Sequence, residues 1–237
     1  MNQIATSSIV RLTKLLLVPM SPLQYFLDTP GATHVHCLDQ AYKVLEQDGK
    51  EDVRTFFQPY HSWIRKGLFW ADRGWKNVYH FYANPDKPDT LSWPGASAEA
   101  QYYYNQAINN FSQDVLKGMF YLGAALHIIQ DMCVPHHSKG IIFDGHQEFE
   151  KWVGAHWQEF AIENNGLYLD YTHPSQWVDY NAQASASLYP KVSTHARSNE
   201  IMYAEAAKVL IPLTIQSTAG FLNFVRNELA GVTLRLE

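Results

Sequence analysis

Apolar residues recur every three or four positions along most of this chain, which is the spacing of one face of an α-helix. Between residues 33 and 47, for example, Val35, Leu38, Tyr42 and Leu45 share one face, and a glycine follows the end of the pattern. No alternation of apolar and polar residues is sustained over more than six positions. The pattern therefore predicts an all-α protein.

The most apolar predicted helix runs from a capping Asp114 to about Asp131. Its apolar residues cover more than one face, so we expect it to be the central buried helix, stopped by Pro135. Residues 67–97 hold several glycines and prolines and no sustained period, which predicts a long loop of a kind that is often functional. The remaining predicted helices cover residues 33–47, 51–66 (ending before Gly67), 97–111, 144–164, 175–188 and 198–229, the last as one helix or as two with a kink at Pro212.

Length and composition favour one folded domain. The 237 residues suffice to bury a sizeable core, and a composition of 46% hydrophobic and 17% charged residues argues against a disordered chain. We expect a single multi-helix domain over residues 31–237, preceded by an N-terminal arm, residues 1–30, that packs on it.

The chain shows no pattern typical of membrane insertion. No stretch reaches the roughly 18 apolar residues that cross a bilayer. The apolar run at residues 15–18 ends at Pro19 and is short for the core of a signal peptide. We therefore expect no transmembrane segment, and a cytoplasmic location is favoured over secretion.

Charge and cysteine content narrow the function classes. The net charge is −5, from 18 basic and 23 acidic residues, and no block of like charges occurs. This argues against a general nucleic-acid binder, which displays a basic stripe. It does not argue against an anionic substrate in a metal-lined pocket, where the ions carry the positive charge. The two cysteines, Cys37 and Cys133, are expected to be free, buried thiols.

The central predicted helix carries an imidazole and a carboxylate one turn apart. His127 and Asp131 are four residues apart, so they share a face and can both reach one ion. By itself, His127 fits a hydrogen-bonded core histidine equally well. A carboxylate is costly to bury on an apolar helix unless it is paired or bound to metal, however, so Asp131 at the same depth favours a metal site.

A second set of possible ligands follows directly. Pro135 breaks the helix and lets a histidine of the pair His136 and His137 fold back toward the residues just passed. His146 and Glu150 then form another pair four residues apart on the next predicted helix. Each of these residues is common on surfaces, but two such pairs around a histidine-bearing turn provide what a multinuclear zinc site needs.

The run from Phe120 to His137 resembles the signature H-x3-D-x3-P-x-H of the bacterial zinc-dependent phospholipase C family. That family places H-x3-E on the next helix, which residues 146–150 match. The resemblance implies an all-α domain of the phospholipase C and single-strand nuclease superfamily, with zinc as its cofactor.

The resemblance also implies roles for the individual ligands. His127 and Asp131 would bind one ion of a close pair, with Asp131 bridging to the neighbouring ion. His136 takes the variable position before the last histidine of the motif and is the less favoured ligand of the two. A separate ion would be held by the last histidine of the motif and the later pair: His137, His146 and Glu150.

Three upstream segments extend the resemblance. The segment that ends in Asp72 resembles the family segment whose aspartate binds metal and can act as a base. The segment H-F-Y-A-N-P-D resembles one whose first residue, here His80, is a ligand, although the spacing from Asp72 is shorter than usual. The segment G-A-T-H resembles one whose histidine, here His34, binds a third ion. The matches run in order over residues 31–155.

The third metal site departs from the family pattern. Secreted members begin with a tryptophan that completes this site, and the corresponding position, near Gln24, is not a tryptophan. The third ion is therefore absent, or His34 holds it with a substitute such as His36 or Asp28. The expected cofactor is accordingly two or three zinc ions.

The headgroup pocket departs as well. The positions that surround choline in family members fall near Leu27 and at Arg73 and Asn77 in this chain. A guanidinium repels a quaternary ammonium, whereas an aromatic cage attracts it. We therefore expect Arg73 and Asn77 to bind the substrate and choline not to be the preferred headgroup.

The implied reaction is hydrolysis of a glycerophospholipid to diacylglycerol and a phosphorylated headgroup. The partner is then a phospholipid at a membrane surface, bound transiently, and no nucleic acid is expected. Zinc would hold the phosphate oxygens and lower the pKa of a water molecule toward about 7, and Asp72 is the candidate to orient or deprotonate that water. Two alternatives stay open: a single-strand nuclease of the same superfamily, and a non-catalytic protein that keeps a structural zinc site.

Overall fold

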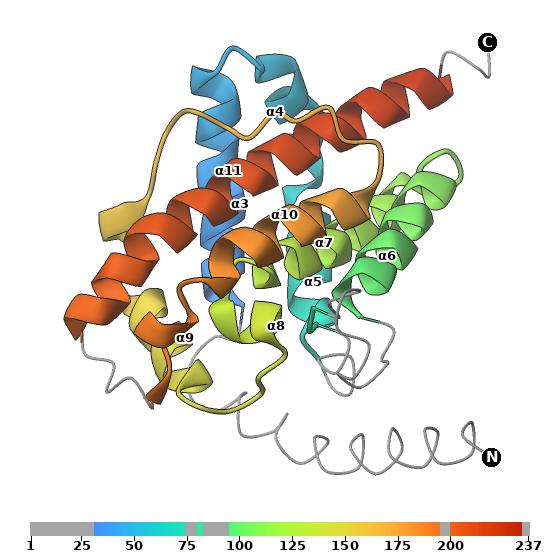
Figure 1. Cartoon of the computed structure of the whole chain (residues 1–237). Coiled ribbons are helices and arrows are strands. Elements are labelled where there is room, and N and C mark those ends of the chain that lie inside the picture. The colour runs from blue at the N-terminus through green and yellow to red at the C-terminus, as the bar shows by residue number, and fades with distance from the viewer. Residues whose placement is uncertain (1–30, 74–79, 83–94, 195–199, 234–237) are drawn as a thin grey trace, which may run out of the picture.

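A computed structural model describes the protein over residues 31–73, 80–82, 95–194 and 200–233 (Figure 1). Every regular element in these ranges is helical and none is a strand, which confirms the all-α prediction. The predicted arm, residues 1–30, lies outside them. The elements are α3 (Ala32–Gln47), α4 (Glu51–Phe57), α5 (His61–Ala71), α6 (Ala96–Phe111), α7 (Val115–Asp131), α8 (Pro135–Lys139), α9 (His146–His156), α10 (Pro174–Ala186) and α11 (Glu200–Thr233), with 3-10 helices η2 (Gln58–Tyr60), η4 (Trp157–Phe160) and η5 (Tyr189–Lys191).

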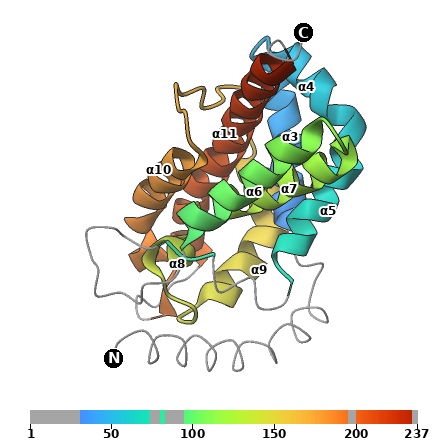
Figure 2. The same cartoon turned by 90° about the vertical axis from the view of Figure 1, so that its right-hand side faces the viewer.

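Helix α7 lies at the centre of the fold, packed between α5 and α6 (Figure 2). The Asp114 carboxylate caps it by accepting the Lys117 backbone N–H at 3.0 Å, and every residue from Leu122 to Asp131 is buried. The prediction of a capped, central helix is confirmed. Pro135 does not stop this helix, however. It begins the short helix α8 after a three-residue turn, a position where the missing N–H costs nothing.

Two glycines let α5 and α7 approach closely. A Cβ on Gly67 would lie 1.9 Å from the Phe120 carbonyl oxygen, and a Cβ on Gly123 would lie 1.9 Å from the Ile64 carbonyl oxygen. No larger residue fits at either position without moving a backbone. The prediction that the second helix ends before Gly67 is therefore wrong, because the glycine serves the contact with α7 and α5 continues to Ala71.

The predicted helix 51–66 is divided in the structure. Helix α4 ends at Phe57, the 3-10 turn η2 follows, and α5 begins at His61. Pro59 lies within η2. Proline has no N–H for the α-helical bond and crowds the preceding turn, so the α-helix is interrupted at this point.

The predicted helix 144–164 is shorter than expected. Asp144 and Gly145 have φ angles of 68° and 88°, which belong to the left-handed region, so α9 begins only at His146. After His156 the chain tightens into η4, and Ala161 is already extended. The sequence signal at Asp144 was that of a helix start, but its backbone makes a turn instead.

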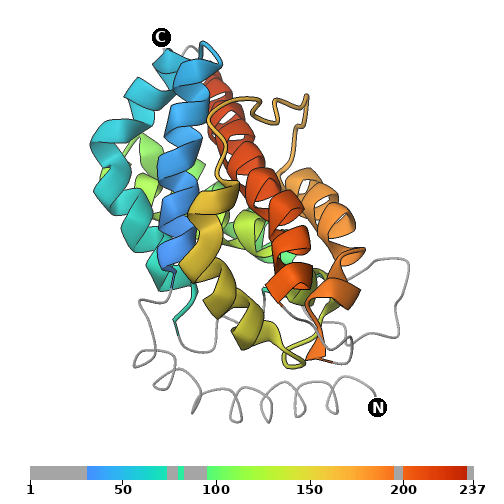
Figure 3. The same ribbon diagram turned by 90° about the vertical axis from the view of Figure 1, so that its left-hand side faces the viewer.

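The last described helix, α11, continues through Pro212 as one element rather than two. It packs on α3 and α10 and crosses the molecule from one end to the other (Figures 1 and 3). Neither α11 nor any other helix in the described ranges combines the length and the apolar composition needed to cross a membrane.

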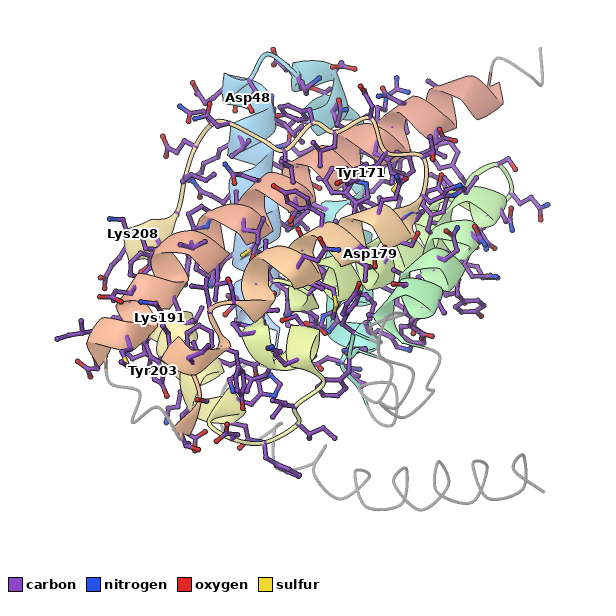
Figure 4. All side chains as sticks on the ribbon, in the orientation of Figure 1. Asp48, Tyr171, Asp179, Lys191, Tyr203 and Lys208 are labelled. Atoms are coloured by element: carbon purple, nitrogen blue, oxygen red, sulfur yellow. The ribbon has the colours of Figure 1, made fainter. Side chains whose placement is uncertain are left out.

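One end of the molecule is held by a hydrogen-bonded carboxylate, and the opposite end carries the predicted metal ligands. At one end, beyond the end of α3, the Asp48 carboxylate accepts hydrogen bonds from the N–H groups of Asn165 and Gly166 at 2.9 and 2.7 Å and from the Tyr168 hydroxyl at 2.8 Å (Figure 4). At the opposite end lie the start of α3, the end of α5, and helices α8 and α9 (Figure 1). The predicted metal ligands gather at this second end.

Candidate metal centre

The eight predicted ligands lie in the described residues and come together in three groups. Within each group, one ligand atom from each residue lies within 4.8 Å of the others. The groups are His34, His127 and Asp131; Asp72, His80 and His127; and His137, His146 and Glu150.

The first two groups share His127, and Asp131 lies close to histidines of both. Its Oδ1 lies 3.4 Å from His34 Nε2. Its Oδ2 lies 2.8 Å from His80 Nδ1, 3.3 Å from His127 Nε2 and 4.0 Å from His137 Nδ1. The two oxygens therefore face different candidate ligands, so this carboxylate could contact cations on both sides.

Helix α7 contributes three residues of its last turn to this centre. His127 and Asp131 lie one helical turn apart, and the side chain of Gln130 lies between them in sequence and reaches His34 at the start of α3. Gln130 Oε1 lies 2.7 Å from His34 Nδ1, and Gln130 Nε2 donates to Thr218 Oγ1 at 3.0 Å. With Nδ1–H donating to the amide, the His34 Nε2 lone pair faces Asp131. We did not anticipate this role for Gln130, although a buried amide beside a ligand on an apolar helix was a usable signal.

Backbone hydrogen bonds fix the short segment that carries His80. The Tyr82 N–H donates to the His137 carbonyl at 2.9 Å, and the Ala96 N–H donates to the Phe81 carbonyl at 3.1 Å. The Phe81 ring also stacks on His137, with centroids 5.0 Å apart. His80, predicted from sequence as a ligand, is thus tied to both α6 and α8.

The third group presents both of its histidines through Nε2. His137 Nδ1 lies 3.0 Å from the His80 carbonyl oxygen, and His146 Nδ1 lies 3.3 Å from that of Ile142. Each backbone carbonyl accepts the Nδ1 proton, which fixes the tautomer and leaves Nε2 for a metal. The two Nε2 atoms lie 3.7 and 2.9 Å from Glu150 Oε1.

His136 belongs to none of the candidate groups found among the described residues. Its Nε2–H donates to the Asp144 carbonyl at 3.0 Å, and its ring stacks on His146 with centroids 4.8 Å apart. Burial lowers the pKa of His136 to about 4, so the ring is neutral. It supports the turn beside the third group rather than binding metal itself.

Asp72 lies at the rim of the second group. It follows the last residue of α5, its Oδ1 is 3.9 Å from His127 Nε2, and 22% of its side chain is exposed. A carboxylate in this position touches both the buried ligands and solvent, which is what a residue that handles a water molecule requires.

The remaining predicted positions are only partly described. Arg73 is exposed and directly follows Asp72. Asn77, like Asp28, lies outside the described residues. His36 stacks on Trp157 with centroids 4.4 Å apart and joins no candidate group there. His36 as the substitute ligand for a third ion is therefore not supported.

Neighbouring carboxylates set the charge of the buried imidazoles. Burial disfavours the charged form of His127, but the carboxylates around it, Asp131 foremost and then Asp72 and Glu150, together raise the pKa of His127 to about 9. Glu150 acts in the same way on His146, whose pKa is also raised to about 9. Burial, together with the charge of His127, lowers the pKa of His80 even though Asp131 lies beside it. A bound cation would take the place of the protons on His127 and His146, so metal binding releases protons.

The residues present fit zinc. Among the described side chains, both ring nitrogens of His80 and His127 and Oδ2 of Asp131 are buried without a partner in hydrogen-bonding geometry. Such atoms are costly to bury unless a cation satisfies them. Imidazole nitrogens and carboxylate oxygens are ordinary zinc ligands. The prediction of zinc as the cofactor rests on these atoms as well as on the sequence.

The comparisons with known proteins agree with this centre. The sequence model of the family described as zinc dependent phospholipase C matches residues 33–195. The fold is similar to that of the alpha toxin from Clostridium absonum, with a TM-score of 0.72 at 18% identity over 85% of this chain and 64% of that one. It is also similar to Clostridium perfringens alpha-toxin from avian strain SWCP, with a TM-score of 0.71 at 19% identity over the same shares.

This chain therefore spans 64% of the length of each toxin. No curated protein matches it. The two toxin structures support the fold, and the family model supplies the assignment. Because that model covers more than half of the 237 residues, and because its name agrees with the zinc ligands that the structure gathers, the chain belongs to the zinc-dependent phospholipase C family.

Proposed function

We propose that this protein is a zinc-dependent phosphodiester hydrolase that cleaves glycerophospholipids to diacylglycerol and a phosphorylated headgroup. The main support is the position of Asp131, whose two oxygens face His34 on one side and His80 and His127 on the other. Adjacent cation sites that share a carboxylate suit hydrolysis of phosphate esters, because both the attacking and the leaving oxygen need stabilisation. Family membership makes a phospholipid the first substrate to test.

The chemistry divides between the metal and the protein. Zinc, when bound, supplies positive charge for the phosphate oxygens and makes a water molecule more acidic. Asp72, at the exposed rim, is placed to orient that water and accept its proton. The water oxygen bonds to phosphorus, the bond from phosphorus to the glycerol oxygen breaks, and the glycerol oxygen takes up a proton.

Replacing Asp72 with Asn tests this assignment. The amide keeps the size of the side chain but cannot accept the proton, so we expect kcat/KM to fall by roughly 10²- to 10⁴-fold. Most of the zinc should remain bound, as measured by metal analysis of the purified protein. Asp170→Asn, which alters an exposed loop carboxylate, is the control and should leave both values unchanged. Loss of zinc together with activity in D72N would show that Asp72 is chiefly a ligand.

The substrate class is decided by one panel of assays on the metal-loaded protein. Phospholipids with choline, ethanolamine, serine and inositol headgroups are compared with single-stranded oligonucleotides. We expect two or more zinc ions per chain, cleavage of lipids, and no preference for choline, because the Arg73 guanidinium next to Asp72 would repel its ammonium. Cleavage of oligonucleotides alone would favour the nuclease alternative. One bound zinc ion without turnover would favour a structural metal site.

A further inference from the structure

The loop that joins α8 to α9 carries three consecutive apolar residues, 141–143, which we call the apolar tip. None of the three is buried, and 64% of Phe143 is exposed. Among the described residues, the other exposed large apolar side chains all lie on helices: Tyr102, Leu116, Tyr180, Ile201 and Val209. Phe143, exposed next to two partly buried isoleucines, forms an apolar surface that is costly in water unless another surface covers it.

The loop holds the apolar tip in a defined place. The Ile141 N–H donates to the His136 carbonyl at 2.9 Å, and His136 Nε2–H donates to the Asp144 carbonyl at 3.0 Å. The Thr194 N–H reaches the same Asp144 carbonyl at 3.3 Å, and the hydroxyls of Thr194 and Tyr189 donate to its carboxylate. Hydrogen bonds therefore hold the chain on both sides of the tip, and Phe143 is displayed between them.

The tip lies beside the candidate metal centre. The loop follows the helix that carries His137, and Phe143 precedes His146 by three residues, which is at most about 11 Å of extended chain. The Ile142 carbonyl within the tip itself accepts the His146 Nδ1 proton. A surface that covered the tip would therefore also face the third group of ligands.

We infer that the apolar tip docks on a phospholipid bilayer, with Phe143 entering the interface between headgroups and acyl chains. This inference rests on the proposed function, because a lipid whose phosphate reaches the metal centre keeps its acyl chains in the bilayer. An aromatic ring suits that interface, and the exposed Lys139 before the loop suits the phosphate groups around it. The tip thus brings the centre to the membrane and selects lipid over nucleotide substrates.

Binding to vesicles tests the docking directly. Sucrose-loaded vesicles of equal parts phosphatidylcholine and phosphatidylglycerol are sedimented with the metal-loaded protein. Phe143→Ser should weaken binding by about tenfold or more, since the ring is the most exposed side chain of the tip. Phe143→Leu should restore most of it. The matched control is Leu116→Ser, which removes an exposed apolar side chain from the start of α7, far from the ligands at its other end. Equal binding of F143S and the unaltered protein would overturn the inference.

Kinetics separate docking from catalysis. On a short-chain phospholipid below its micelle concentration, F143S should keep the rate of the unaltered protein within about twofold, whereas on vesicles its rate should fall by about tenfold. An equal fall on both substrates would overturn the inference, because the ring would then act at the metal centre. Vesicle binding that depends on Phe143 without any lipid cleavage would support docking and contradict the proposed activity. Cleavage of short-chain lipid by a protein that does not bind vesicles would support the proposed activity and contradict docking.

Discussion

Gln130 connects the metal centre to the last helix through two hydrogen bonds. Its Oε1 accepts the His34 Nδ1 proton, and its Nε2 donates to Thr218, whose hydroxyl in turn donates to the Thr214 carbonyl. Because Gln130 Oε1 can only accept, the neutral His34 ring carries its proton on Nδ1. A side chain that fixes the orientation of a ligand in this way tunes metal affinity without touching the metal.

Replacing Gln130 with Leu should therefore weaken zinc binding at the group of His34, His127 and Asp131. Leucine keeps the buried volume but offers no acceptor, so we expect a loss of about 10- to 100-fold in affinity. Zinc retained after dialysis against graded chelator measures it. Gln183→Leu, on the exposed side of α10, is the control. If Q130L keeps its full zinc content at every chelator concentration, the amide has no positioning role.

The contact between α5 and α7 depends on the absence of side chains at two positions. Gly123→Ala would place a methyl group where the Ile64 carbonyl oxygen lies, so we expect the free energy of unfolding to fall by about 3 kcal/mol, as in other overpacked cores.

The matched control is Gly154→Ala in α9. A Cβ at that position meets nothing closer than Thr33 Oγ1 at 3.7 Å. Because glycine is a poor helix former, the alanine should stabilise the protein by about 0.5 to 1 kcal/mol. Urea unfolding of both variants measures the two effects. Similar stabilities for G123A and G154A would mean that the helices separate at little cost.

The helices that were predicted well are those whose own residues determine them. The apolar period and the Asp114 cap sufficed for α7, and most of α3 followed from its single apolar face. The breaks were harder to predict. Helix α5 continues past Gly67 because the glycine contacts the Phe120 carbonyl of α7, which a local sequence pattern does not reveal. The left-handed turn at Asp144 depends on His136 and Thr194, which donate hydrogen bonds to it from elsewhere in the chain.

The metal ligands were predictable for the opposite reason. His127 and Asp131, and His146 and Glu150, are pairs that one helical turn brings together, so their spacing is visible in sequence. The contact of Gln130 with His34 joins residues 96 positions apart, and no local pattern encodes it. The apolar tip was also missed, because only the structure shows that its residues remain exposed.

The eight candidate ligands come from four helices, from Asp72 directly after α5 and from the segment around His80, so bound zinc would tie most of the fold together. Ions that bind only the folded chain stabilise it by about 4 kcal/mol when free metal exceeds the Kd 1,000-fold. For a chain of this size, removal of the metal with EDTA should lower Tm by roughly 10 °C. Differential scanning calorimetry measures the change.

Two further samples complete that experiment. Zinc added back after EDTA treatment should restore the original Tm. Glu150→Gln, which weakens the third group at a half-exposed position, should show a smaller drop on chelation. A Tm that EDTA does not change would contradict a metal centre that binds with useful affinity.

Helix α11 has a consequence for how the protein is made. All eight ligands lie between residues 34 and 150, whereas Thr218, which anchors Gln130 and through it His34, lies on α11. At about 5 to 20 residues per second, a ribosome completes the ligands several seconds before it completes this helix. During that interval the nascent chain carries every candidate ligand but lacks α11, which packs on α3 and α7 and supplies the partner of Gln130. We therefore expect stable capture of zinc to be a late event of synthesis, and a chain stalled before α11 should release the metal to a mild chelator that the finished protein resists.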